Sequence, residues 1–154
     1  MTRPLPVPDD MSAPYWKAAA EHVYMVARCV RCGTLAMPPD VMCTACGSTD
    51  PEYEFTPVSG RGVVRSWTVV RQSFLPGFDV PFVLVDVELG EQKELRVIGR
   101  YLDDGGEPSV GAAVHVVFEE LGDGDSVRTV RGVLDEIARQ VTLGRTDGTD
   151  VDDH

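Results

Sequence analysis

The chain of 154 residues has no run of about 18 apolar residues, which is the length that a membrane-spanning helix needs. Its first segment, MTRPLPVPDDMSAP, carries one arginine and several prolines but no apolar stretch, so it is not typical of a secretory signal. These two absences predict a cytoplasmic protein without a membrane partner. Disulfide bonds are not expected in that compartment.

Positive charge is scarce in this sequence. Lysine and arginine number 14, against 25 aspartates and glutamates, and the formal net charge is −11. Four of the aspartates lie in the last eight residues, yet the remainder of the chain is still acidic. A protein that binds nucleic acid by neutralising phosphates needs a local or overall excess of positive charge. We therefore expect no nucleic-acid partner and no affinity for anionic membranes.

Recognisable catalytic motifs are also lacking. The chain contains no Gly-x-Ser-x-Gly, no His-Glu-x-x-His and no glycine-rich phosphate loop with a lysine. Of the three histidines, His154 is terminal, His115 lies in an alternating strand pattern and His22 closes a predicted helix. Asp86 and Glu88 share one face of a predicted strand, where we expect them to be solvated. These observations predict a protein without a catalytic site of its own.

The four cysteines form two Cys-x-x-Cys pairs separated by ten residues, and each pair is followed by a glycine. Two residues between sulfurs let a tight turn direct both thiolates at one ion, and four thiolates match the tetrahedral preference of zinc. Because four protein ligands leave no open position, we expect a structural Zn²⁺ rather than a catalytic one. Iron would accept the same sulfurs, and a redox dithiol normally has one such pair beside a βαβ pattern. The predicted metal ligands are Cys29, Cys32, Cys43 and Cys46.

The sequence pattern divides the chain into four parts. Residues 1–11 are rich in proline and are expected to be flexible. Residues 12–56 are predicted to hold a short helix, SAPYWKAAAEH, followed by a zinc ribbon. Residues 57–134 are predicted to form an OB-fold, and residues 135–154 a short helix with a disordered acidic tail.

The second half of the chain is rich in valine, threonine and aromatic residues with period-two alternation, which is typical of strands. Its first predicted strand is long enough to bend through two sheets, and five such strands favour a small closed barrel of the OB type. The expected fold is therefore mainly β: an N-terminal helix and a rubredoxin-like zinc ribbon, followed by a five-stranded OB-fold barrel. The predicted strands span residues 61–73, 81–89, 93–102, 113–121 and 125–134, and the C-terminal helix spans residues 134–144.

Arginines accompany the tryptophan of the first predicted barrel strand. Arg65, Trp67 and Arg71 share one parity of that segment, and Arg61 precedes them. Guanidinium groups around an indole ring suit the phosphates and adenine of coenzyme A, or the acidic surface of a protein partner. The alternative is that these arginines are scattered over a solvated surface.

The segment QSFLPGFDVPF after that strand is more apolar than a loop normally is. It brings Phe74, Leu75, Phe78 and Phe82 close together in the sequence. Such a loop would either dock on a partner and cover an acyl chain, or fold back onto its own barrel. We treat these four residues, with the arginines and Trp67, as candidates for binding coenzyme A or a partner.

Several motifs follow one another in a recognisable order: a helix with a Tyr-Trp pair, the segments CVRCG and CTACGS, and then VSGRGVVRSWTVV and PFVLVDVEL. This order resembles the zinc-ribbon and OB-fold proteins of domain-of-unknown-function family 35, over residues 12–121. Many proteins carry a ribbon, so the Gly-Arg-Gly turn at residues 60–62 and the Ser-Trp-Thr strand after it are the more specific part. The segment SVRTVRGVLDEIARQ departs from the family, whose members often end in a short tail with proline and phenylalanine.

The resemblance implies a non-catalytic accessory subunit of acyl-CoA metabolism, in lipid, steroid or polyketide pathways. Family members assemble with thiolases, acyltransferases or lipid-transfer-protein-like aldolases, so it implies a hetero-oligomeric partner of this superfamily and acyl-CoA as a further ligand. Two other functions stay open at this point. One is a stand-alone acyl-CoA-binding protein or small enzyme acting on CoA thioesters, and the other is a single-stranded nucleic-acid-binding ribbon and OB-fold module.

Overall fold

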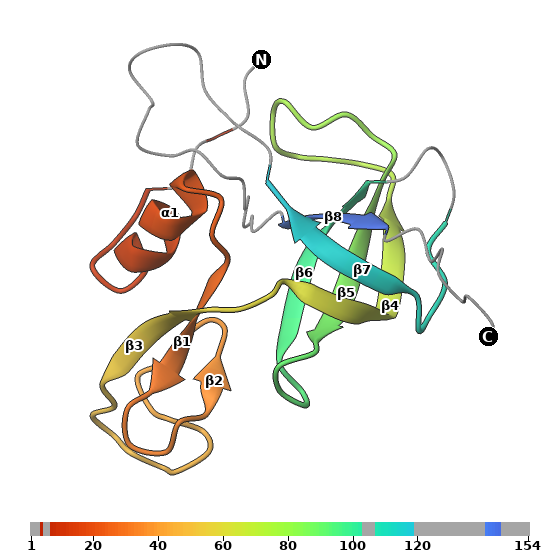
Figure 1. Cartoon of the computed structure of the whole chain (residues 1–154). Helices are drawn as coiled ribbons and strands as arrows, with labels where there is room; N and C mark the ends of the chain where they lie inside the picture. The colour runs from red at the N-terminus through yellow and green to blue at the C-terminus, as the bar shows by residue number, and fades with distance from the viewer. Residues whose placement is uncertain (1–3, 5–6, 103–106, 119–140, 146–154) are drawn as a thin grey trace, which may run out of the picture.

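The computed structural model describes residues 4, 7–102, 107–118 and 141–145, and the chain is mainly β with one short helix (Figure 1). The helix and a three-stranded sheet form the N-terminal part, and a closed five-stranded barrel forms the rest. The fold class predicted from the sequence is confirmed. Within the described ranges, no helix is long and apolar enough to cross a membrane. The segment predicted over residues 135–154 as a short helix and an acidic tail lies outside them, apart from residues 141–145.

Helix α1 (Ala13–Ala20) lies against the ribbon sheet and turns two adjacent aromatic residues into the core. Tyr15 and Trp16 are 4% and 6% exposed, and their rings meet edge to face with centroids 5.0 Å apart. Tyr15 also meets the ring of Tyr24 edge to face. Aromatic pairs in this arrangement add to the stability gained from burial alone. The helix is therefore held by its aromatic side chains, since eight residues are too few to be stable in isolation.

The first sheet has the order β2-β1-β3, with both neighbours antiparallel to the central strand. It consists of β1 (Met25–Cys29), β2 (Leu35–Ala36) and β3 (Tyr53–Pro57). Val26 and Cys29 on the central strand are completely buried. The sheet therefore delivers the first cysteine of the chain into the interior, at the point where β1 ends.

The barrel has the strand order β4-β5-β6-β8-β7, and β7 pairs back with β4 to close it. The pairing of β6 with β8 is parallel, and the other four pairs are antiparallel. This closed five-stranded Greek-key barrel is the OB-fold. Its strands are β4 (Arg61–Val70), β5 (Phe82–Leu89), β6 (Arg96–Leu102), β7 (Ala113–Val117) and β8 (Val141–Arg145).

Several predicted elements of the barrel differ from the structure. Strand β6 begins at Arg96 rather than at residue 93, and β7 ends at Val117, before the predicted end at residue 121. The first strand ends at Val70, three residues earlier than predicted, because Arg71 already belongs to the following loop. The helix predicted over 134–144 is wrong in its described part, where Val141–Arg145 form the fifth barrel strand instead. Pairing with two neighbouring strands satisfies backbone groups that a short terminal helix would leave to water. The strand predicted over 125–134 lies outside the described residues.

One continuous core joins the ribbon to the barrel. Val64, Val85 and Val87 from the barrel are completely buried, and Val26 of the ribbon belongs to the same cluster. Each fully buried side chain of this size stabilises the fold by about 1.5–3 kcal/mol. Because these contacts cross from one part to the other, packing rather than the connecting segment fixes how the two parts sit together.

The Gly-Arg-Gly turn opens the first barrel strand, and both of its glycines are required. Gly60 has a φ of 73°, a left-handed conformation that other residues rarely adopt. Gly62 lies directly against β5, so that a Cβ added to it would lie 2.3 Å from the carbonyl oxygen of Glu88. The turn therefore allows β4 and β5 to approach more closely than side chains would permit.

Candidate metal centre and barrel surface

The four cysteines converge on one point at the end of the ribbon. Their Sγ atoms all lie within 4.8 Å of one another, and the Sγ atoms of Cys32 and Cys43 are 3.6 Å apart. A tetrahedron with metal–sulfur bonds of about 2.3 Å has edges of about 3.8 Å. Cys29 and Cys43 are buried, while Cys32 and Cys46 are exposed. The predicted ligands are thus gathered around one point, close enough for a single tetrahedral ion to be bound by all four.

Each cysteine pair sits in a tight turn with the same two backbone hydrogen bonds. The N–H of Cys29 donates to the carbonyl oxygen of Thr34 at 2.9 Å, and the N–H of Gly33 donates to the carbonyl oxygen of Cys29 at 2.7 Å. The second turn repeats this pattern around Cys43, with Gly47 donating at 2.8 Å. Both glycines have a positive φ, 76° and 73°. Glycine after each pair is therefore a requirement of the turn, as the sequence suggested.

Electrostatics favours a cation between these sulfurs. The hydroxyl of Thr34, together with its backbone N–H, lowers the pKa of the Cys32 thiol to about 6. At Cys46 the backbone N–H of Ser48 lowers the pKa, but desolvation and the three neighbouring thiols outweigh it and raise the pKa to about 11. Four thiolates this close repel one another, and a divalent cation removes that repulsion. Donor type, spacing and charge therefore all fit Zn²⁺.

The arginine and the tryptophan expected on one face of the first barrel strand do not share that face. A bulge in β4 leaves Arg65 without a partner residue on β5, and the alternation of side chains shifts there by one position. Trp67 pairs with Val85 and packs on the core, whereas Arg65 points outward and forms an ion pair with Glu88. The predicted parity fails because a bulge is invisible to a simple period-two pattern.

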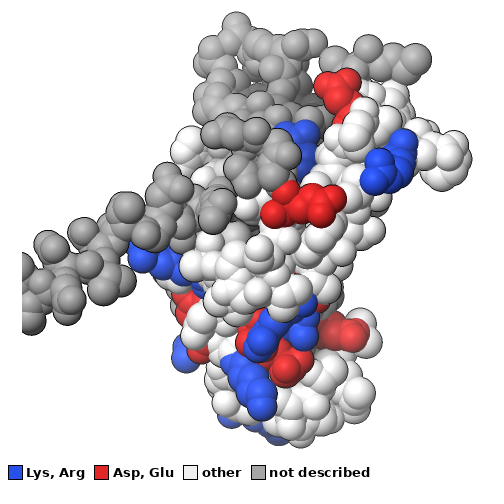
Figure 2. Space-filling view, turned by 90° about the vertical axis from the view of Figure 1, so that its right-hand side faces the viewer, with Lys and Arg blue, Asp and Glu red and all other residues white. Residues whose placement is uncertain are grey.

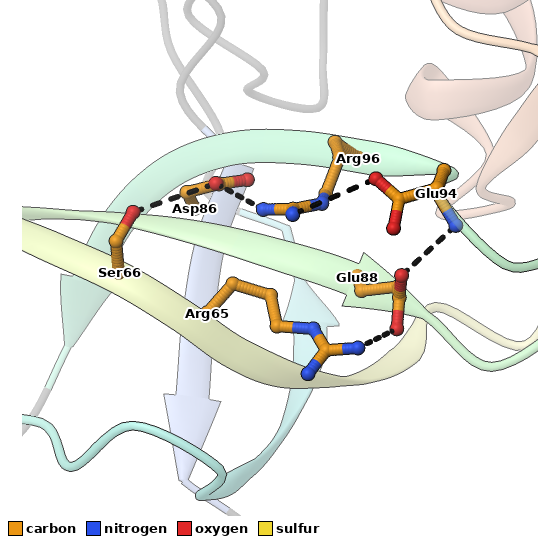
Figure 3. Close-up of polar contacts among 6 residues, drawn as sticks. All are labelled: Arg65, Ser66, Asp86, Glu88, Glu94 and Arg96. Carbon is orange, nitrogen blue, oxygen red and sulfur yellow. Dashed lines mark hydrogen bonds and ion pairs between the residues drawn. The ribbon is translucent and has the colours of Figure 1, made fainter.

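The outer face of β4, β5 and β6 carries a connected set of polar side chains (Figure 3). Arg96 forms an ion pair with Asp86 at 2.5 Å and a longer one with Glu94 at 3.7 Å. The Glu94 N–H, donating at 2.9 Å, and the Arg65 guanidinium both lower the pKa of Glu88. These charges therefore neutralise one another rather than attracting an external anion. The residues drawn are Arg65, Ser66, Asp86, Glu88, Glu94 and Arg96.

The loop 71–81 between β4 and β5 presents its tip to solvent. Phe74 is 89% exposed and Leu75 is 44% exposed. At the base of the loop, the rings of Phe78 and Phe82 lie 6.2 Å apart and are half-buried. Part of the loop thus folds onto its own barrel, while the tip is an apolar surface that makes little contact with the barrel.

A pocket of about 560 Å³ lies beside the base of this loop. Its lining combines apolar side chains with two arginines and two carboxylates. Tyr101, which belongs to the barrel core, contributes to it from β6. The residues around the pocket are Val69, Arg71, Asp79, Pro81, Phe82, Val83, Arg100, Tyr101, Leu102 and Glu107.

The predicted binding residues therefore divide between the two ends of the barrel. Arg71 and Phe82 line the pocket, and Phe74 lies in the loop beside it. Arg61 lies at the opposite end of β4, where it pairs with His115 on β7 (Figure 1). On the face drawn in Figure 2, basic and acidic groups of the described residues lie close to each other, with uncharged surface between the clusters. This face offers no continuous basic track for a phosphate backbone.

Sequence reasoning missed the contribution of β6 to this site. Arg100 and Tyr101 reach the pocket because β6 pairs with β5, which places Arg100 opposite Leu84 and Tyr101 opposite Val83. Alternation predicted the two strands but not which residues would face the loop. The only available signal was the hairpin between them, which fixes the pairing register once its length is known.

Comparison with known proteins fits this geometry. Two protein-family models match, one described as the rubredoxin-like zinc ribbon domain of ChsH2 over residues 16–52, and one as the C-terminal OB-fold domain of ChsH2 over residues 55–119. A DUF35 domain-containing scaffold protein of Methanocaldococcus jannaschii is 30% identical over 122 residues, which cover 76% of this chain and 84% of that protein. The chain belongs to the DUF35 family. Its N-terminal part is a zinc ribbon, and its cysteines are positioned to bind the metal.

Three further proteins are similar to this chain. A probable enoyl-CoA hydratase alpha subunit of Thermomonospora curvata is 34% identical over 93 residues, covering 60% of this chain, and the chain spans only 28% of the length of that protein. A solved structure titled Ltp2-ChsH2(DUF35) aldolase matches with a TM-score of 0.68 at 23% identity, over 91% of this chain and 98% of the other. A DUF35 protein of unknown function from Sulfolobus solfataricus matches with a TM-score of 0.52 at 14% identity, over 70% and 78%. At these identities the two structures support the fold alone.

Proposed function

We propose that this DUF35 protein is a non-catalytic accessory subunit that docks on a thiolase-superfamily enzyme and supports acyl-CoA turnover. The names of its relatives support this proposal: one is a scaffold protein, one a subunit of an enoyl-CoA hydratase, and one a DUF35 chain together with an aldolase. In this role the zinc is structural, and the barrel supplies the contact surface.

The exposed apolar loop 71–81 is the observation that carries the proposal. In the OB-fold, the loop between the first two strands borders the usual binding face, and here that loop connects β4 and β5. Phe74 at its tip leaves an aromatic ring almost fully in water, which is unfavourable unless a partner covers it. Aromatic residues in such positions often dominate the affinity of an interface.

The adjacent pocket supports direct contact with an acyl-CoA. Val69, Phe82 and Val83 offer apolar surface for a chain or for pantetheine, while Arg71 and Arg100 offer positive charge for a phosphate. Asp79 and Glu107 line the same pocket and oppose an anion, so the pocket alone would bind the ligand weakly. We infer that the ligand is shared with the partner enzyme, whose surface would complete the site.

Co-expression with thiolase-superfamily proteins of the same organism, one at a time, tests the docking. A complex should co-elute in size-exclusion chromatography, and Phe74→Asp should weaken it at least about 30-fold, the factor that corresponds to 2 kcal/mol. Val110→Asp is the matched control, because Val110 is also an exposed apolar residue of the barrel region, at 68%, but lies outside the loop. If no such protein co-elutes, or if both variants behave alike, the docking proposal fails.

The stand-alone acyl-CoA-binding protein is a second candidate, which the pocket favours. Calorimetry with acetyl-CoA and longer acyl-CoAs separates the two functions. Binding without any partner, lost in Arg71→Ala, would favour the stand-alone role. A nucleic-acid module would instead bind single-stranded oligonucleotides at low salt, which the acidic charge and the mixed surface of Figure 2 argue against.

A further inference from the structure

The turn between β5 and β6 reaches across to the zinc ribbon through one side chain. The Oε1 of Gln92 accepts a hydrogen bond from the N–H of Leu35 at 2.8 Å, and its Nε2 donates to the carbonyl oxygen of Leu35 at 2.9 Å. Leu35 opens β2, an edge strand of the ribbon sheet. The side-chain amide therefore pairs with this edge as a neighbouring strand would, across 57 positions of sequence.

Leu35 is adjacent to the residue that orients two of the metal ligands. The carbonyl oxygen of Thr34 accepts the N–H of Cys29 at 2.9 Å, and the hydroxyl and N–H of Thr34 both hydrogen-bond to the sulfur of Cys32. A displacement of Leu35 would therefore be transmitted to half of the ligand set. Groups that orient metal ligands by hydrogen bonding commonly change metal affinity about 10- to 100-fold when they are removed.

The turn that carries Gln92 is itself anchored. Glu91 accepts the N–H of Ser59 at 2.6 Å, in the segment that connects the ribbon to the barrel. Within the turn, the N–H of Leu95 donates to the carbonyl oxygen of Gln92 at 3.2 Å. The side chain of Leu95 is buried in the shared core. The amide of Gln92 is thus presented from a stiff support and not from a free loop.

We propose that Gln92 is a positioning residue of the zinc site, which transmits the rigidity of the barrel to the first cysteine turn and slows the loss of the metal. The ribbon cannot supply this rigidity alone, because β2 has two residues and pairs with a strand on one side only. Gln92 hydrogen-bonds to the backbone of Leu35 on the side that does not pair with β1. The barrel in this way contributes to metal retention without providing a ligand.

Transfer of zinc from the full-length, zinc-loaded protein to an excess of a chromogenic chelator tests this proposal. Gln92→Ala removes both hydrogen bonds and should speed the release about 5- to 30-fold, the factor that one to two net hydrogen bonds provide. Gln92→Glu has almost the same shape but sets a carboxylate oxygen against the carbonyl oxygen of Leu35, so it should also release faster. Lys93→Ala, an exposed neighbour in the same turn, is the matched control and should match the wild type.

Two further measurements separate positioning from a general loss of stability. Val85→Ala weakens the barrel core and should lower the melting temperature, but it should leave the release rate unchanged well below that temperature. In the Co²⁺-substituted protein, the visible d–d bands report ligand geometry, and they should shift in Gln92→Ala but not in Lys93→Ala.

Three results would overturn the assignment. The first is an equal release rate in the wild type, Gln92→Ala and Lys93→Ala. The second is a release rate in Val85→Ala as fast as in Gln92→Ala, because the rate would then follow overall stability. The third is an unchanged cobalt spectrum in both glutamine variants. Gln92→Glu, which keeps the size of the side chain, decides the matter if the alanine variant does not fold.

Discussion

Replacing Gly62 with alanine should destabilise the barrel strongly, although it adds only one methyl group. The new Cβ would lie 2.3 Å from the carbonyl oxygen of Glu88 and 2.7 Å from Cγ1 of Val87. Both distances are far shorter than a van der Waals contact, and the first obstacle is backbone that no rotamer change can move. Strands β4 and β5 would have to separate at the pair formed by Gly62 and Leu89.

The magnitude follows from this obstruction. Overpacking a close-packed interior costs about 1–3 kcal/mol where side chains can adjust, and more where the backbone must move. We therefore expect a loss of at least about 3 kcal/mol, which lowers the melting temperature of a chain this long by about 6–12 °C. Gly90→Ala is the matched control, because its Cβ would meet only the carbonyl oxygen of Arg61, at 3.6 Å, which is an ordinary contact.

Thermal unfolding of the zinc-loaded variants, followed by calorimetry or circular dichroism at one pH, measures the difference. Gly62→Ala should melt well below Gly90→Ala, and Gly90→Ala should stay close to the wild type. If Gly62→Ala melts within about 2 °C of the wild type, then the two strands are not as close as described. The pairing of Gly62 with Leu89 would then be wrong, and with it the physical reason for the Gly-Arg-Gly turn.

Two further predictions concern the metal and the polar face of the barrel. Removing zinc with a strong chelator should unfold the ribbon, because its small sheet has little core of its own. Restoring zinc should recover the near-ultraviolet circular dichroism. A melting curve that is unchanged after complete removal of zinc contradicts a structural metal. Glu88→Gln should lower the melting temperature at neutral pH, because the Glu94 N–H and the Arg65 guanidinium lower the pKa of Glu88 from its ordinary 4.5. A carboxylate whose pKa is lowered in the folded state stabilises that state above its ordinary pKa, and this stabilisation is lost as the pH falls through the lowered pKa. The difference in melting temperature between wild type and variant should therefore shrink below pH 4.5. If the difference in melting temperature stays constant as the pH falls, the charge on Glu88 is not the cause of that difference.

The sequence predicted what is encoded locally. The metal ligands could be named because both ligands of each pair, and the glycine that shapes their turn, lie within five consecutive residues, such as Cys29 to Gly33. The strands β5 and β6 could be placed because both segments are rich in β-branched and aromatic residues, which is typical of strands. The number of strands predicted the barrel type, and the comparison confirmed the OB-fold over residues 55–119 and the zinc ribbon over residues 16–52.

The errors and omissions concern contacts between distant residues. The bulge at Arg65 has no local signature, so the predicted face with Trp67 was wrong. The contact of Gln92 with Leu35 depends on how two hairpins that are distant in the sequence meet. The strand Val141–Arg145 follows a segment with the composition of a helix, and only its pairing with β6 and β7 gives it an extended form.

The position of β8 has a practical consequence for the design of truncated proteins. It fills the gap between β6 and β7, and it comes from the far end of the chain. A fragment that stops at residue 134, where sequence patterns alone would cut, would leave β6 and β7 with bare edges facing each other and ready to recruit foreign strands. Soluble expression should therefore depend on keeping residues 141–145. During synthesis, the barrel can close only after these residues have been added to the chain.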